Sequence, residues 1–249
     1  MDLWAAAGGP ACVGPLSGTL VRVVEGQEQV ATNRLVDTLD EQALLESLLE
    51  TSKPPRPPGC EGLHYLLATP FRYPPLAHGS RFGRGDEPSI FYGSARIDTA
   101  LAETAYYRLV FLAGMAEPPP GGRITTQHTA FSARYRTARG VRLHRPPFDA
   151  CQDRLRNPSR YDETQQLGAS LRRASVAAIQ YRSARDRAGG LNIALFEPHA
   201  LASKRPLSRE RWLCDTRYEA VSFFNVDAGT RHYPRGNFLV DGTLPAPAT

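Results

Sequence analysis

The sequence predicts an α+β fold with a small N-terminal helical appendage. Segments with a strand-like pattern run through most of the 249 residues, and two or three helical patterns interrupt them. They do so without the regular strand–helix alternation of a doubly wound sheet. Near the N-terminus, SKPPRPPG at residues 52–59 contains four prolines and a glycine, which exclude a helix or a central strand. This segment is therefore expected to be a linker.

The part before the linker is expected to be mostly helical. Residues 1–20 are rich in glycine, proline and alanine, and a leucine-rich segment follows. Five leucines recur there at helical spacing and mark one face: Leu39, Leu44, Leu45, Leu48 and Leu49. Asp37, Thr38 and Asp40 are all suitable N-cap residues, and the pattern does not choose among them. We therefore expect a helical segment with its linker at residues 1–59 and a larger domain at residues 60–249.

The second part is expected to contain runs of strands that a few helices interrupt. LHYLLATPF at 63–71 is expected to be a strand entering a loop, SIFYGS at 89–94 a short buried strand, and residues 97–113 a helix. The proline-rich MAEPPPGG ends that helix. Residues 161–180 begin with Asp162 and Gln165 at capping-box spacing, which predicts a second helix start. Four more segments have strand patterns: 129–136, 141–148, 191–198 and 219–226.

The composition excludes several classes of protein. No stretch approaches the roughly 18 apolar residues of a membrane span. Asp2, with no lysine or arginine before Arg22, is the wrong flank for a secretory signal, so a cytoplasmic protein is expected. The four cysteines form no C-x-x-C pair and the six histidines no metal-binding pair, so neither a metal site nor a disulfide framework is expected.

The positive charge of the chain is carried almost entirely by arginine. The formal net charge is +5, and only Lys53 and Lys204 among the 30 basic residues are lysines. A GC-rich genome would produce the same bias. Guanidinium groups nevertheless suit bidentate contacts with phosphate or carboxylate, so the surplus charge favours an acidic ligand or partner.

Glu103 interrupts an otherwise apolar helical face. Ala100, Thr104, Tyr107 and Phe111 recur at helical spacing, and Glu103 falls among them. A carboxylate on an inward face must be paired, protonated or placed at the wall of a cleft. Either a structural Glu–Arg pair or a functional carboxylate fits this pattern.

A second candidate feature is the loop at residues 68–86. It places Arg72, Arg81 and Arg84 among glycines and prolines, just before the strand that ends at Tyr92. Glycine lets the backbone approach an anion, and arginine binds phosphate. The loop matches neither a Walker motif nor a dinucleotide fingerprint. A solvent-exposed turn has the same composition.

The spacing of three residues is more specific. Arg81 precedes Tyr92 by 11 residues, and Tyr92 precedes Glu103 by 11. With G-S-R-F at 79–82, F-Y-G-S at 91–94 and A-L-A-E at 100–103, the chain resembles the RES-domain family over about residues 60–226. The segment 181–198 resembles the serine segment of that family and points to Ser183.

The chain departs from the family pattern in two places. The usual turn G-R-W-N is S-R-F-G here, so its asparagine is absent and Phe82 replaces tryptophan. The family's first-strand arginine has no counterpart in LHYLLA, and Arg72 is the nearest candidate.

The resemblance implies an ADP-ribosyltransferase-like fold and an enzyme that cleaves the nicotinamide–ribose bond of NAD by hydrolysis or phosphorolysis. NAD would be the substrate, with no further cofactor. Glu103 would stabilise the positive ribosyl centre. Arg81 and Arg72 would bind the pyrophosphate, Tyr92 would pack against nicotinamide or ribose, and Ser183 would donate a hydrogen bond to the ligand.

The resemblance also implies a toxin of a toxin–antitoxin pair whose partner is a helix-turn-helix antitoxin. Neither a membrane nor direct nucleic-acid binding is part of this interpretation, and it leaves homo-oligomerisation open. Two alternatives remain: transfer of ADP-ribose to a protein, and a nonenzymatic nucleic-acid-binding module. The second would use the arginines of residues 134–145, although their strand-like alternation favours a solvated sheet face.

Overall fold

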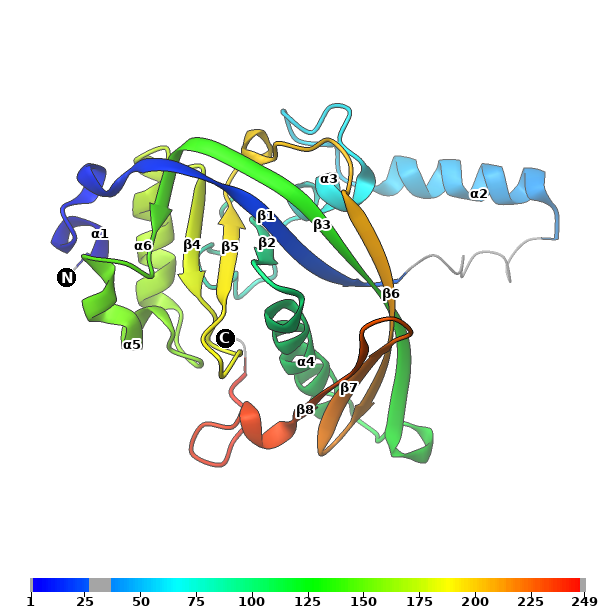
Figure 1. The fold of residues 1–249 in the computed structure, drawn as a ribbon. Coiled ribbons are helices and arrows are strands. Elements are labelled where there is room, and N and C mark those ends of the chain that lie inside the picture. The colour runs from blue at the N-terminus through cyan, green and yellow to red at the C-terminus, as the bar shows by residue number, and fades with distance from the viewer. Residues whose placement is uncertain (1, 27–36, 247–249) are drawn as a thin grey trace.

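The computed structural model describes residues 2–26 and 37–246. An eight-stranded mixed sheet runs through them in the order β1-β2-β5-β4-β3-β6-β7-β8, and β1 also pairs with β3. Helices lie around this sheet (Figure 1). The predicted α+β class is thus confirmed. Within the described ranges, no helix combines the length and apolar composition of a membrane span.

Five strands close into a ring because β1 pairs with both β2 and β3. The bounds of these strands are β1 (Gly14–Glu25), β2 (Phe91–Ser94), β3 (Arg123–Arg142), β4 (Ala178–Arg182) and β5 (Leu191–Leu195). The β3–β4 pair is parallel and the other four pairs are antiparallel. The ring encloses one buried cluster that includes Leu16, Leu20, Phe91, Phe131 and Leu195.

The β3 strand joins the ring to a second group of strands. Its first ten residues pair with β6 (Ser208–Arg217), followed by β7 (Ala220–Asn225) and β8 (Gly229–Pro234). We predicted separate strands at 129–136 and 141–148, whereas β3 continues through both to residue 142. Gly140 permits this, because a Cβ atom there would lie 2.3 Å from the Cβ of Leu16 on β1.

The helix predicted at residues 97–113 is confirmed as α4 (Ile97–Ala113), which packs on β1, β6 and β7. Its buried side, however, is not the one that the pattern marked. Leu101, Ala105 and Leu109 face the core, while Tyr107 and Phe111 are 50% and 56% exposed. The marked face contacts a cavity instead.

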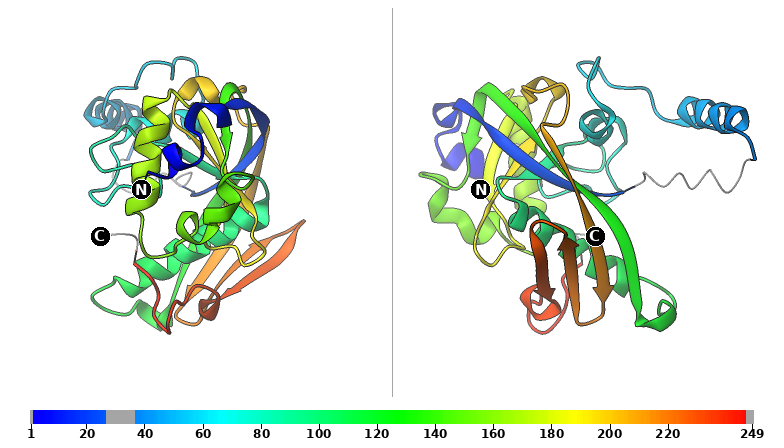
Figure 2. Two further views of the ribbon diagram at one scale, coloured as in Figure 1. Left: turned by 90° about the vertical axis from the view of Figure 1, so that its left-hand side faces the viewer. Right: turned by 45° about the vertical axis from the view of Figure 1, so that its right-hand side comes forward.

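The N-terminal part is not a separate helical appendage. It contains α1 (Leu3–Ala6), α2 (Leu39–Ser52) and all of β1, which pairs with β3 from Gly14 to Glu25. Thr38 caps α2 in a capping box with Glu41. The helix stands away from the sheet (Figure 2), so the leucine face marked by the pattern is largely exposed. The expected boundary at residue 59 thus divides a continuous sheet.

The strand predicted at 63–71 is wrong, because this segment forms α3 (Tyr65–Arg72). The Nδ1 atom of His64 accepts a hydrogen bond from the backbone N–H of Leu66 at the start of the helix. Leu67 and Phe71 lie one turn apart and are both buried against the ring. A short apolar run fits either a strand or a helix, and tertiary packing decides here.

The predicted capping box at Asp162 is also wrong. Helix α6 (Asp162–Arg173) has Tyr161 as its N-cap residue, without a side-chain cap. The Gln165 side chain donates hydrogen bonds to the carbonyl oxygens of His78 and Ser80 at 3.0 and 3.1 Å. It therefore attaches α6 to the turn that contains Arg81.

Candidate functional site

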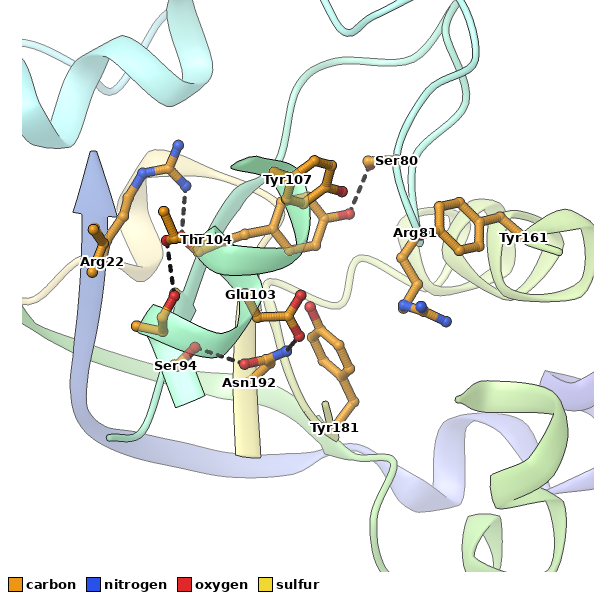
Figure 3. Close-up of a pocket in the computed structure, with 14 residues that line it drawn as sticks. Arg22, Ser80, Arg81, Ser94, Glu103, Thr104, Tyr107, Tyr161, Tyr181 and Asn192 are labelled. Atoms are coloured by element: carbon orange, nitrogen blue, oxygen red, sulfur yellow. Dashed lines mark hydrogen bonds between the residues drawn. The ribbon is translucent and has the colours of Figure 1, made fainter. Parts of the chain in front are cut away.

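A cavity of about 280 Å³ lies where β1 and β2 separate. The two strands pair at Val21 and Ser94, and the next residues of β1 line the opening. The marked face of α4 forms one wall, and the turn at residues 80–81 forms another. Figure 3 shows the side chains that line this cavity.

Glu103 is the only carboxylate among the described residues that line this cavity. Its Oε1 atom accepts hydrogen bonds from Ser183 Oγ and from Asn192 Nδ2, both at 2.6 Å. Its Oε2 atom makes no hydrogen bond within the described part of the chain. The two donors hold one oxygen and leave the other to face a ligand.

Ser183 lies behind Glu103 and not at the cavity surface. It is completely buried, and its Oγ atom accepts hydrogen bonds from the backbone N–H groups of Arg185 and Asp186 at 3.0 and 2.9 Å. Its hydroxyl proton is donated to Glu103. The sequence predicts that Ser183 contacts the ligand, whereas the structure gives it a positioning role.

Asn192 was missed as a site residue, and so was the residue that orients it. Ser94 and Asn192 are register partners on β2 and β5, both buried. The Ser94 hydroxyl donates to Asn192 Oδ1 at 2.7 Å. This bond directs the amide nitrogen of Asn192 toward Glu103. The buried serine in F-Y-G-S was the available signal, but strand register cannot be obtained from one sequence.

Tyr92 connects β2 to the Arg81 turn. Its hydroxyl lies 2.8 Å from Ser80 Oγ and accepts the N–H of Phe82 at 3.2 Å. Burial raises the pKa of Tyr92 to about 12, so the phenol is neutral at physiological pH. Its ring lines the cavity, as the sequence predicts, while its hydroxyl fixes the turn.

Arg81 also lines the cavity. Its guanidinium lies 4.6 Å from the centre of the Tyr161 ring. One nitrogen donates to the carbonyl oxygens of Leu155 and Asn157 at 3.2 and 2.9 Å. These contacts hold the side chain in place without neutralising its charge.

Arg22 is a second arginine in the cavity, and sequence analysis did not select it. It lies on β1, donates to the carbonyl oxygen of Tyr92 at 2.6 Å, and lies 5.3 Å from the centre of the Phe91 ring. Its Nε atom is buried without a partner, and no carboxylate of residues 2–26 or 37–246 pairs with it. Desolvation lowers the pKa of Arg22 to about 10. The signal was a single arginine within the valine-rich segment 21–24.

Arg72 does not reach the cavity. It ends α3, where it donates to the carbonyl oxygen of Pro54 and pairs with Glu50 at 2.7 Å. The first strand of the chain is β1, so its arginine is Arg22. We placed the first strand at α3, and this error led to Arg72. Arg84 is exposed and also lies outside the lining.

Three further tyrosines complete the lining: Tyr107, Tyr161 and Tyr181. Burial raises the pKa of Tyr181 well above the ordinary value, so this group stays neutral. In the view of Figure 3, Arg22 and Arg81 lie on either side of Glu103. The cavity thus combines neutral aromatic walls, two cations that suit phosphate, and one carboxylate that suits a positive centre. No cluster of metal-binding side chains occurs within the described ranges.

Comparisons with known proteins identify one family. The family model named RES domain matches residues 54–217, which is more than half of the chain. No curated protein matches the sequence. Among solved structures, a chain in the M. tuberculosis MbcT–MbcA toxin–antitoxin complex aligns with a TM-score of 0.47 and 10% identity, covering 79% of this chain and 85% of that chain. Arg22 lies before the residues that the family model matches.

Proposed function

Because the chain belongs to the RES-domain family, we propose that it cleaves the bond between nicotinamide and ribose in NAD, with Glu103 as the catalytic carboxylate. One observation carries this proposal. Two buried donors hold Oε1 of Glu103, while the Oε2 atom remains available in a cavity that also contains Arg22 and Arg81. A negative oxygen is thereby held beside two phosphate-binding cations.

The carboxylate suits the chemistry of this bond. In NAD the nicotinamide nitrogen carries a positive charge, and it leaves as neutral nicotinamide with the electron pair of the bond. The ribose carbon is left electron-deficient and resembles an oxocarbenium ion. A fixed carboxylate such as Glu103 stabilises that charge as it develops, and needs no reorganisation to do so. Water or phosphate then adds to the ribose carbon.

The arginines suit the pyrophosphate. Arg22 is half-buried, its Nε atom is buried without a partner, and no carboxylate of the described residues pairs with it. A phosphate placed against it would supply the missing negative charge. The guanidinium of Arg81 lies over the Tyr161 ring, and one of its nitrogens donates to a carbonyl oxygen. Its remaining N–H groups can bind the same anion.

Incubation of the purified protein with NAD tests this proposal. We expect free nicotinamide to appear, together with ADP-ribose in a hydrolytic reaction or a phosphorylated ADP-ribose in a reaction that requires phosphate. Radiolabel from the adenine half that stays on protein would indicate ADP-ribosylation of a protein target. If nicotinamide is not released with or without phosphate, the proposal fails.

We also propose, from the family membership, that the chain acts as a cytoplasmic toxin neutralised by a helix-turn-helix antitoxin. The net charge of +5 suits an acidic partner. Expression of the chain alone should deplete NAD and arrest growth, and co-expression of the proposed antitoxin should prevent both effects. Growth arrest with normal NAD levels would contradict the link between the reaction and toxicity.

A further inference from the structure

A second cavity of about 180 Å³ lies beside the first, along β1 and α3. Among the described residues, Arg22 alone lines both. The pairing of β1 with β2 ends at Val21, so both cavities lie along the same unpaired edge of β1. The guanidinium of Arg22 thus stands between two hollows, only one of which contains Glu103.

We propose that this second cavity, the α3 groove, binds the adenosine half of the dinucleotide. The inference rests on the proposed function and follows from the order of groups in NAD. Cleavage at Glu103 requires the nicotinamide riboside in the first cavity. The pyrophosphate joins the two nucleosides, and Arg22 is the cation shared by both cavities. The remaining half of the molecule then lies in the α3 groove.

The side chains of the groove suit an adenine base and its ribose. The His64 ring lies 4.6 Å from the Tyr65 ring, yet Tyr65 remains 52% exposed, and this exposed part of the ring can stack on a base. Leu66 and Pro70 from α3 and Val24 from β1 provide apolar walls. The hydroxyls of Thr69 and Thr129 also line the groove and can bind polar edges of the ligand.

The charged side chains distinguish the two ends of the groove. Arg22 lies at the end that adjoins the first cavity, and Glu25 lines the same groove but is paired with Arg108 at 3.0 Å. The free cation is therefore at the junction, where the proposal places the pyrophosphate. The groove itself offers a neutral aromatic and aliphatic surface, which suits a base more than a second phosphate.

Tyr65→Ala tests the groove, with Tyr73→Ala as the matched control. Both tyrosines are exposed and belong to α3 or its C-cap, so neither change should unfold the protein. Only Tyr65 lines the groove. Loss of one base–aromatic stack is expected to raise the KM for NAD about tenfold, with kcat within about twofold of the wild-type value. Tyr73→Ala should leave both values unchanged.

AMP, which contains only the proposed occupant and one phosphate, is the direct probe. It should compete with NAD in the wild-type protein and in Tyr73→Ala, and compete about tenfold less well in Tyr65→Ala. The inference is overturned if AMP does not compete, or if the two variants behave alike. If the wild-type protein releases no nicotinamide, the proposed function fails. Calorimetric titration of AMP into the same three proteins then tests independently whether AMP binds in the groove. The dissociation constant for AMP must be higher for Tyr65→Ala than for Tyr73→Ala.

Discussion

Two donors converge on one oxygen of Glu103, and each depends on a buried neighbour. Ser183 is held by the N–H groups of Arg185 and Asp186. Asn192 is held by Ser94. A carboxylate can only accept, so Glu103 requires the donor end of the Asn192 amide, and the Ser94 hydroxyl satisfies the acceptor end that remains. The carboxylate is thus oriented by a chain of hydrogen bonds from buried side chains.

Ser94→Ala should destabilise the protein because it leaves Oδ1 of buried Asn192 without its donor. We expect a loss of about 1–3 kcal/mol in the free energy of unfolding, measured in urea. Ser132→Ala is the control, since Ser132 also makes a side-chain hydrogen bond, to the Ser208 hydroxyl, but this bond is exposed. Its cost should stay within about 0.5 kcal/mol. Equal losses would show that the Ser94 bond does not hold a buried group.

Arg81→Lys should weaken NAD binding although it preserves the charge. One ammonium group cannot lie flat on Tyr161, contact two carbonyl oxygens and bind phosphate at the same time. Calorimetry should show a loss of about tenfold or more in affinity, in line with one lost charged hydrogen bond. An unchanged affinity together with a lower melting temperature would instead restrict Arg81 to supporting the segment at Leu155 and Asn157.

At the scale of the elements, the sequence pattern predicted secondary structure accurately where the segment was long or had clear ends. The helix at 97–113 and the strand ending at Ser94 were predicted with nearly their observed bounds. Tyr92 and Glu103, which these two segments contribute, both line the cavity. The segment at 63–71 failed because a short apolar run fits both periods. That error led to Arg72, which lies outside the cavity.

Helix α6 is fixed to the Arg81 turn by close backbone contact. A Cβ atom added at Gly168 would lie 1.8 Å from the carbonyl oxygen of Phe82. Gly168→Ala is therefore expected to destabilise the protein by about 1–3 kcal/mol, although alanine normally favours a helix over glycine. Thermal unfolding should show the lower melting temperature.

Gly114→Ala is the matched control for that change. Gly114 caps α4, has a negative φ of −87°, and an added Cβ atom would meet only ordinary contacts at 3.5 Å or more. Its melting temperature should stay close to that of the wild-type protein. If the Gly168→Ala and Gly114→Ala proteins have the same melting temperature, α6 and the turn can move apart without loss of stability.

For the whole molecule, the sequence predicted the fold class but not the closure of the ring. Closure depends on β1 pairing with β3, whose partners are more than 100 residues apart in the chain, as Leu20 and Ala133 are. No local pattern records such a pairing. Residues 1–20 are rich in glycine and proline, so the sequence did not predict β1, and residues 1–59 were expected to be an appendage. Composition and motif spacing therefore located most of the cavity but missed Arg22, which β1 contributes.

The stability of the whole fold should fall in acid because His128 is buried as a neutral group. Burial lowers its pKa from 6.5 to about 4. The unfolded chain binds a proton below pH 6.5, whereas the folded protein does so only near pH 4, so the stabilisation is complete above 6.5 and is lost between these values. The total is about 3 kcal/mol. Urea unfolding at pH 7.5 and at pH 4.5 should show this decrease.

His128→Phe should remove most of this dependence on pH between 6.5 and 4, since no proton can then bind at that position. The control is His232→Asn, which changes an exposed histidine and should leave the slope unchanged. If the stability of the His128→Phe protein falls with pH as steeply as that of the wild-type protein, the acid sensitivity belongs to other groups.

The most direct test of the proposed reaction is nicotinamide release by Glu103→Gln. Glutamine keeps the shape and can still accept the bonds of Ser183 and Asn192, but it removes the negative charge. The account predicts an unchanged melting temperature and a rate about 10²- to 10³-fold lower. The control, Glu117→Gln at an exposed position beyond α4, should retain the full rate. A folded Glu103→Gln protein that releases nicotinamide from NAD at the wild-type rate would contradict the assignment.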